Sequence, residues 1–360
     1  MSTIDVINWV GRHKAVRPVG LFLRRATSGK SFAQMAAGSG RRIGSPIMGA
    51  YLAPLTGTTV KQNLTDGHVM FGTIEKYVTT FKPDFVMCTF PDLAAEAEAC
   101  GCEVTIPENA LPSVKVHPIQ THEDMKNLRI PDPYKDGRLK VFIDATKLFT
   151  RRFTLPKTAA AAGPFTLAAE LMGVDIITRK IIKEPPLVHE VMEYSLQVVQ
   201  RYYMELIKAG ADVIGIAEPT CSLLSAKAFA SMVLPYLQRL TKSTPVPSTI
   251  HICGRAGHLV ELMCKTGVTG ISVDSPTDLM KIKDKVPPDI IILGNIAPVE
   301  VLMLKKPEEV RAVVMEMLTA MEGVPNFGLL SGCDLPVGTP LENVQAMINA
   351  VKEYRTMQRA

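Results

Sequence analysis

Residues 249–273 read TIHICGRAGHLVELMCKTGVTGISV and contain one complete strand–helix–strand unit. The apolar run 249–253 is followed by an amphipathic stretch, 256–266, which Gly267 ends shortly before the next apolar run at 270–273. This order is typical of two parallel strands that are joined by a helix.

The same alternation extends over most of the chain. The predicted strands are 43–48, 85–90, 159–165, 213–217, 249–253, 270–273, 290–294 and 327–331. The predicted helices between and after them include 188–209, 225–241, 256–266, 307–321 and 340–356. Eight such strands in 360 residues predict an α/β fold, the (β/α)₈ or TIM barrel, as a single domain.

Two stretches depart from this pattern. Residues 104–156 are rich in Pro, Lys and Asp and are predicted to form a long excursion after the second strand. Residues 1–42 are predicted to form a basic helical extension that precedes the barrel at 43–360. Their only acid is Asp5, against eight basic residues: Arg12, Lys14, Arg17, Arg24, Arg25, Lys30, Arg41 and Arg42. This charge could hold an anionic partner or a cofactor phosphate, or it could be a solvated face.

Composition excludes several other classes of protein. No apolar run approaches the roughly 20 residues that span a bilayer, and the first residues do not resemble a secretory signal. We therefore expect a cytoplasmic protein without a membrane partner. Its seven cysteines are then thiols, metal ligands or core residues rather than disulfides. Nucleic acid is not expected as a partner, because no base-stacking aromatic residues accompany the basic charge.

Residues with metal-binding or acid–base chemistry follow several predicted strands, where a barrel forms its active site. They are Asp92, Glu218, His251, Cys253, Asp274, Asn295 and Cys333. His251 and Cys253 are two residues apart on an extended chain, so they point to the same face and can bind one ion. With Cys333 they form a set typical of zinc with one open coordination position. The alternative is a buried core histidine with inert cysteines.

The three carboxylates, Glu218, Asp92 and Asp274, are the candidate catalytic residues, and each allows more than one role. Glu218 could be an exchangeable fourth zinc ligand or a general base. Asp92 and Asp274 could orient the ligands or bind a cofactor. Each of the three could instead cap a helix at a loop that follows a strand.

Several segments resemble the uroporphyrinogen decarboxylase superfamily from about residue 43 onward. They are Gly163-Pro164-Phe165-Thr166-Leu167-Ala168, Phe90-Pro91-Asp92-Leu93 and Leu293-Gly294-Asn295-Ile296. The resemblance implies the same barrel and places Asp92 at the position of that family's catalytic aspartate. The decarboxylases also need arginines on the first strand, but the segment from Ser45 to Tyr51 contains none. Decarboxylation of a tetrapyrrole is therefore disfavoured. A non-enzymatic corrinoid- or tetrapyrrole-binding protein with a structural zinc is a further alternative, but a structural site normally has four protein ligands and no open position.

The corrinoid-dependent methyltransferases, such as the methylcobamide:coenzyme M methyltransferases, are the branch that the chain resembles more. His251, Cys253 and Cys333 match their zinc ligands, and Gly332-Cys333-Asp334-Leu335-Pro336 resembles the segment around the last ligand. The resemblance implies methyl transfer between a thiol and a corrinoid such as methylcobalamin, which a separate protein carries. The basic first 42 residues look unlike the usual start of that group.

A second function within this branch is demethylation of a methyl ether or methylamine, which would load the corrinoid protein. An apolar pocket would favour the ether, and Met48, Tyr51, Phe90 and Phe165 could line one. We take Asn295, Met48 and Tyr51 as the candidate cofactor-binding residues.

Overall fold

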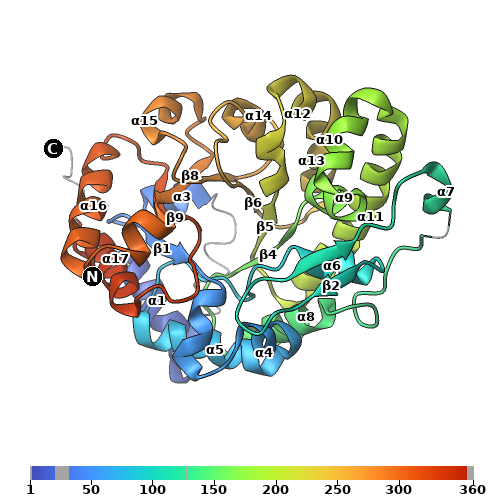
Figure 1. The fold of residues 1–360 in the computed structure, drawn as a ribbon. Helices are drawn as coiled ribbons and strands as arrows, with labels where there is room; N and C mark the ends of the chain where they lie inside the picture. The colour runs from blue at the N-terminus through green and yellow to red at the C-terminus, as the bar shows by residue number, and fades with distance from the viewer. Residues whose placement is uncertain (1, 21–31, 127, 355–360) are drawn as a thin grey trace.

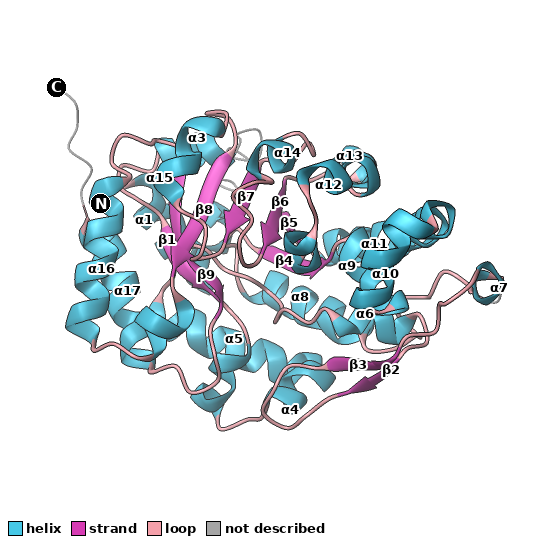
Figure 2. Ribbon diagram, turned by 45° about the horizontal axis from the view of Figure 1, so that its top comes forward, coloured by secondary structure: helices cyan, strands magenta, loops and turns pink. Residues whose placement is uncertain are grey.

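The protein is a barrel of parallel strands surrounded by helices in the computed structural model, which describes residues 2–20, 32–126 and 128–354 (Figures 1 and 2). The strands of the main sheet are β1 (Gly44–Ile47), β4 (Thr158–Ala162), β5 (Val213–Ala217), β6 (Ser248–Ile252), β7 (Gly270–Val273), β8 (Ile291–Ile296) and β9 (Phe327–Asp334). They pair in the order β1-β9-β8-β7-β6-β5-β4, and every pair is parallel.

The eighth predicted strand, 85–90, is present only as an isolated bridge between Met87 and Thr158. Thr158 donates its N–H to the Val86 carbonyl at 2.9 Å and accepts the Cys88 N–H at 2.8 Å, so the segment runs beside β4. Pro83 and Pro91 lie just outside the run and have no N–H to extend the pairing. The predicted (β/α)₈ barrel is thus confirmed, with its second strand reduced to one bridge.

The helices follow the strands and cover the outside of the barrel (Figure 2). Between β1 and β4 they are η2 (Ala50–Thr56), α4 (Val60–Thr65), α5 (Gly67–Phe81), α6 (Ala94–Ala99), α7 (His122–Met125) and α8 (Leu139–Arg152). Between β4 and β7 they are α9 (Pro164–Met172), α10 (Val174–Lys183), α11 (Pro185–Ala209), η3 (Pro219–Leu223), α12 (Ala226–Met232), α13 (Leu234–Ser243) and α14 (Val260–Cys264). The remainder are α15 (Leu279–Ile282), η4 (Lys283–Lys285), η5 (Pro298–Met303), α16 (Pro307–Ala320) and α17 (Leu341–Glu353). None of the helices in the described part of the chain is long and apolar enough to cross a membrane.

Several predicted elements differ in extent from the structure, and three of the differences have a local reason. The predicted strand 159–165 ends at Ala162, because Pro164 begins α9 and suits the first turn of a helix. The predicted helix 225–241 is two helices separated at Val233, and the second has a proline in its first turn. Residues 104–156 are not one excursion, since they hold the antiparallel pair β2 (Glu103–Thr105) and β3 (Ser113–Val116) and also α8, which packs on α5 and α11.

The basic N-terminal segment contains α1 (Thr3–Arg12), η1 (Lys14–Val16) and α3 (Phe32–Ala37). Several of its arginines bind the protein itself. Arg42 donates to the carbonyls of Met321, Glu322 and Val324, and Arg17 donates to those of Thr150 and Arg151. These side chains hold the segment on the barrel rather than presenting charge to an anion. Arg24, Arg25 and Lys30 lie outside the described residues, and the division at residue 42 stays a prediction.

An ion pair between Arg41 and Asp84 connects the start of β1 to the start of the reduced second strand. Arg41 donates to both carboxylate oxygens of Asp84, at 2.6 and 2.7 Å, and each side chain is 1% exposed. Asp84 also accepts from Asn8 Nδ2 of α1 at 2.8 Å and from the Gly44 N–H at 3.3 Å. No ladder is found between β1 and 85–90 among the described residues, so this pair joins two walls that backbone pairing leaves apart.

We predict that Asp84→Ala lowers the free energy of unfolding by about 3 kcal/mol, because Arg41 would keep a buried charge with fewer partners. Because Asp5 also accepts a hydrogen bond from Arg41, at 2.7 Å, Arg41 keeps one acidic partner in the variant. We therefore expect a loss at the lower end of the range that is usual when one partner of a buried ion pair is removed. Urea unfolding followed by circular dichroism measures the change. Glu353→Ala is the control, because Glu353 pairs with Arg311 where both side chains are 53% exposed, and it should cost less than about 1 kcal/mol. Equal losses in the two variants would show that the Arg41–Asp84 pair does not hold the junction.

Candidate metal centre

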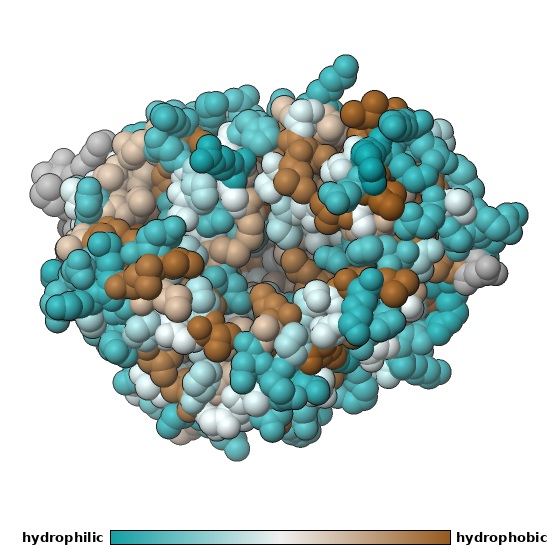
Figure 3. Space-filling model, viewed as in Figure 1, coloured by the Kyte–Doolittle hydropathy of each residue, from teal (hydrophilic) through white to brown (hydrophobic). Residues whose placement is uncertain are grey.

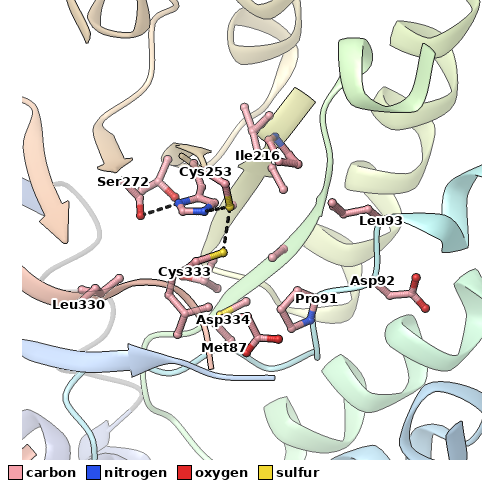
Figure 4. Close-up of a pocket in the computed structure, with 18 of the residues that line it drawn as sticks. Met87, Pro91, Asp92, Leu93, Ile216, Cys253, Ser272, Leu330, Cys333 and Asp334 are labelled. Atoms are coloured by element: carbon pink, nitrogen blue, oxygen red, sulfur yellow. Dashed lines mark hydrogen bonds between the residues drawn. The ribbon is translucent and has the colours of Figure 1, made fainter. Parts of the chain in front are cut away.

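His251, Cys253 and Cys333 meet at the carboxyl end of the barrel (Figure 4). His251 belongs to β6, Cys253 follows that strand directly, and Cys333 lies near the end of β9. Cys253 Sγ is 3.0 Å from His251 Nε2 and 2.9 Å from Cys333 Sγ. Two strands, β7 and β8, separate β6 from β9 in the sheet, so it is the curvature of the barrel that brings these side chains together.

The short contacts shift the pKa values of the two thiols in opposite directions. The contact with Cys253, together with His251, lowers the pKa of the Cys333 thiol to about 5. The same contact with Cys333, together with burial, raises the pKa of Cys253. Ser272 Oγ lies 3.0 Å from His251 Nδ1, which leaves Nε2 facing the sulfurs. The group can therefore offer a thiolate and an imidazole nitrogen to the same point.

This donor set fits a metal ion. The three ligand atoms lie within 4.8 Å of one another, and all three side chains are half-buried. The part of the chain that the structure describes contains no other group of three such side chains at this spacing. One imidazole and two thiolates suit a borderline-soft cation such as Zn²⁺, and a histidine held through its other nitrogen is the usual arrangement around a bound metal. The structure thus brings together the three residues that the sequence singled out.

A cavity of about 270 Å³ lies beside the cluster and extends into the barrel. Its inner walls come from Ile47, Phe85, Met87, Thr158, Ala160, Gly215, Ile216, Ala217, Thr249, Ser272, Leu293 and Leu330. Around its outer part lie Pro91, Asp92, Leu93, Ala94, Leu111, Pro112, Glu170, Pro219 and Asp334. Leu111 and Pro112 belong to the turn between β2 and β3, so this hairpin contributes to one side of the opening. Figure 3 shows the molecule hollowed at its centre in the same view as Figure 1.

Glu218 is not part of the cluster. Its side chain is fully buried and accepts the N–H of Phe165 at 3.0 Å and both the N–H and the hydroxyl of Thr166, at 2.7 and 2.8 Å. Burial raises the pKa of Glu218 to about 7, even though these donors favour the ionised form. The carboxylate therefore caps the first turn of α9, and it lines no part of the cavity. In this arrangement its oxygens are engaged, so a role as ligand or base would require it to leave the cap.

Asp92 lines the cavity, but its charge is compensated by Arg138. Arg138 Nη1 donates to Asp92 Oδ2 at 2.6 Å, and Asp92 Oδ1 accepts the Ala94 N–H at 3.0 Å at the start of α6. In Figure 4 the carboxylate points away from the sulfur atoms. Its position in the outer part of the cavity leaves it able to contact a bound molecule, but not a metal at the cluster.

Asp274 and Asn295 act on the loops beside the cluster. Asp274 accepts the N–H of Gly254 at 2.9 Å and that of Ser275 at 2.6 Å, which fixes the chain immediately after Cys253. Asn295 donates to the carbonyls of Asp274 and Thr277 at 2.9 and 2.6 Å. Asp274 can thus orient the ligand Cys253 through the backbone that follows it, which is one of the roles predicted for Asp274. Asn295 is 5% exposed and does not line the cavity, so the structure offers no contact from it to a cofactor.

Four predicted lining residues, Met48, Tyr51, Phe90 and Phe165, lie in the core and do not line the cavity. The apolar walls come instead from neighbours such as Ile47 and Met87. Adjacent residues of an extended chain face opposite sides, so a prediction that is off by one position selects the wrong face.

Three polar residues of the site were not predicted: Ser272, Glu170 and Asp334. Ser272 pairs directly with His251 in the β6–β7 register, and this neighbour could have been found by aligning the two strands. Asp334 follows Cys333, and Gly49 is the signal for its position, because a Cβ there would lie 2.2 Å from both carboxylate oxygens. Glu170 lies on α9 and lines the cavity, and no pattern in the sequence marks it.

We predict that Thr166→Val lowers the free energy of unfolding by about 1.5–3 kcal/mol, because it removes a hydroxyl that donates to the buried Glu218 carboxyl. Thermal and urea unfolding measure the loss. Thr178→Val is the matched control, since that hydroxyl is exposed and bonds only to its own helix. A loss no larger than that of the control would show that the Thr166–Glu218 contact does not stabilise the fold. The assignment of Glu218 as a ligand or a base would then be open again.

Comparison with known proteins places the chain in a family. Residues 23–354 match the model of the uroporphyrinogen decarboxylase (URO-D) family. A methylcobamide:CoM methyltransferase of Methanosarcina acetivorans is 32% identical over 273 residues, which cover 73% of this chain and 78% of the relative. A methylated-thiol–coenzyme M methyltransferase of Methanosarcina mazei is 28% identical over 267 residues, covering 73% and 71%. A solved structure of a methyltransferase from Methanosarcina mazei has a TM-score of 0.82 at 24% identity and covers 90% of this chain and 99% of that one, so the two share a fold. The chain therefore belongs to the uroporphyrinogen decarboxylase family, and within that family it groups with the methyltransferases.

Proposed function

We propose that this protein is a zinc-dependent enzyme that transfers a methyl group between a corrinoid protein and a small thiol. The observation that carries the proposal is the convergence of His251 Nε2, Cys253 Sγ and Cys333 Sγ beside a cavity large enough for a small molecule. The names of two relatives support it, because both describe methyl transfer to coenzyme M and one describes a methylcobamide donor.

The chemistry requires the substrate sulfur to react as a thiolate, because the thiol itself is a poor nucleophile. Zinc held by the three side chains would favour the deprotonated form of a bound thiol at neutral pH. In the reaction the thiol loses its proton, its sulfur gains the methyl group, and the corrinoid keeps the electron pair of the broken carbon–cobalt bond. The protein residues hold and orient these groups: Ser272 fixes the His251 ring, and the Asp274 contacts fix the loop that carries Cys253.

The corrinoid partner is proposed to approach the carboxyl end of the barrel, where the cavity opens. Leu223 is 63% exposed there, at the end of η3, which directly follows β5. Its neighbour Ser222 lies beside Gly254, with Oγ 3.8 Å from the position of a Cβ, so Leu223 stands close to the loop that carries Cys253. In the proposed complex, Leu223 would give the partner an apolar contact beside the reactive centre. The proposed thiolate ligands require a reducing compartment, so we place the protein in the cytoplasm, where thiols stay reduced.

Demethylation of a methyl ether or methylamine, which loads the corrinoid protein, is the second candidate. The largely apolar cavity favours the ether form of this reaction. Tetrapyrrole decarboxylation has less support, because the lining residues that the structure describes include no arginine or lysine to bind the carboxylates of such a substrate. The same cluster would serve either direction of methyl transfer.

We predict that the purified protein binds about one zinc per chain and that Cys333→Ala abolishes most of this binding and the activity. Metal analysis after anaerobic purification measures the first, and demethylation of methylcobalamin by thiols, followed at its absorption bands, measures the second. Ser272→Ala should weaken zinc about 10–100-fold, because the His251 ring loses its orienting partner. Cys264→Ala is the control thiol, since Cys264 lies on α14 away from the cluster. A wild-type protein without zinc, or a Cys333→Ala variant that keeps both zinc and activity, would overturn the mechanism.

We predict that Leu223→Asp raises the KM for a methylated corrinoid protein at least about tenfold, because it places a charge in the apolar contact. The rate with free methylcobalamin should change much less, since that small donor needs no protein interface. Val19→Asp is the matched control: Val19 is 49% exposed, and its neighbour Gly20 packs against Thr154, before β4, at the opposite end of the barrel. If Leu223→Asp affected both donors equally, the docking surface of the corrinoid protein would not include Leu223.

A further inference from the structure

A row of small residues opens the interior of the barrel below the cluster. Ala160 of β4 pairs with Gly215 of β5, and Gly215 pairs with Thr249 of β6. All three line the cavity, and Thr249 lies two residues before His251 on the same strand. Layers of barrel interiors are usually filled by bulky branched side chains. Here the small side chains leave a hollow that begins at the metal ligands and continues inward.

The walls of this hollow are mostly hydrocarbon, with hydroxyl groups from Thr158, Thr249 and Ser272 among the described residues. Phe85 and Met87 line it from one side, and Leu293 and Leu330 line it from the strands β8 and β9. A molecule that enters the hollow therefore exchanges water for apolar contacts. An uncharged hydrocarbon group gains from that exchange, whereas an ionised group loses its hydration without replacement.

The ionisable side chains that line the cavity outside the cluster are acidic in the described part of the chain. They are Asp92, Glu170 and Asp334, and none of the described residues that line the cavity is a lysine or an arginine. Asp92 is compensated by Arg138. Glu170 has no cationic partner within ion-pair distance in the described part of the chain. A negative charge on a bound molecule would therefore meet repulsion from Glu170 in surroundings that screen it poorly.

We propose that the hollow binds the uncharged, apolar part of the methyl-transfer substrate and that it discriminates against sulfonates and carboxylates. This inference rests on the proposed function for the position of the reacting sulfur or oxygen at the cluster. The substrates expected from this inference do not include a thiol that carries a sulfonate. A simple alkyl or aryl thiol, or an aryl methyl ether in the reverse direction, fits both the walls and the charge.

Binding of toluene and toluene-4-sulfonate to the zinc-loaded protein tests the charge rule without any reaction. The two probes share one ring and differ by the sulfonate, and calorimetric titration measures both affinities. Toluene should bind at least about tenfold more tightly. Equal or tighter binding of the sulfonate would overturn the inference, and so would the absence of toluene binding.

Activity provides the second test, with methylcobalamin as donor and propane-1-thiol or 2-mercaptoethanesulfonate as acceptor. We expect kcat/KM to be at least about tenfold higher for propane-1-thiol after correction for the thiolate fraction of each acceptor. A higher value for the sulfonate overturns the inference and leaves the proposed function intact. If neither thiol reacts, the proposed function fails, while the toluene measurement still decides the inference.

Two variants locate the effect. Ala160→Leu fills the hollow, so it should weaken toluene and lower kcat/KM for phenylmethanethiol more than for ethanethiol, with zinc content unchanged. Glu170→Gln removes one negative charge, so it should raise the relative rate of the sulfonate several-fold. Glu316→Gln, at an exposed position on α16, is its matched control and should leave the ratio unchanged. If Ala160→Leu leaves toluene affinity as it was, or if Glu170→Gln and Glu316→Gln alter the ratio equally, the assigned hollow is wrong.

Discussion

The buried pair of Arg41 and Asp84 closes the barrel where strand pairing does not. Parallel strands usually hold their neighbours through a ladder of backbone hydrogen bonds, but the second strand contributes one bridge, to Thr158, and faces β1 without a ladder among the described residues. The bidentate contact connects these two segments at their amino ends. Ile47 at one side of this junction and Phe85 with Met87 at the other all line the cavity. The shape of the site therefore depends on an ion pair that lies at the opposite end of these segments.

A hollow barrel loses packing that a filled one would have, and the structure compensates around β4. The end of that strand is held by two buried carboxylates: Glu96 accepts the Ala162 N–H at 2.8 Å, and Glu218 caps the helix that begins two residues later. Burial raises the pKa of Glu96 to about 8 and that of Glu218 to about 7, so each carboxylate costs energy when ionised and is retained for the backbone groups that it satisfies. These contacts fix one wall of the cavity without filling it.

Much of this architecture follows from the sequence, because apolar runs and helix signals are local. β5 and β7 have the predicted bounds, and His251, Cys253 and Cys333 meet as expected from strand ends in a barrel. The errors concern what local patterns do not contain. Glu218 follows a strand, as the ligands do, but its carboxylate accepts hydrogen bonds from the first turn of α9. The donors there lie more than 50 positions before Glu218 in the sequence. Met48 and Ile47 are both apolar, and only the direction of the strand face decides which one meets the cavity.

Methyl transfer and substrate choice depend on side chains at different levels along the same strands. His251 and Thr249 are both on β6, two residues apart, so they share a face: the first belongs to the cluster and the second to the wall of the hollow. A change of side chain at Thr249, Gly215 or Ala160 can alter the size of the hollow without moving the ligand atoms. A shift of β6 by one residue would instead turn the side chains of His251 and Thr249 away from the interior. The pairing of β5, β6 and β7 therefore fixes where the reaction takes place, while the size and charge of the inner side chains select the molecule that reacts there.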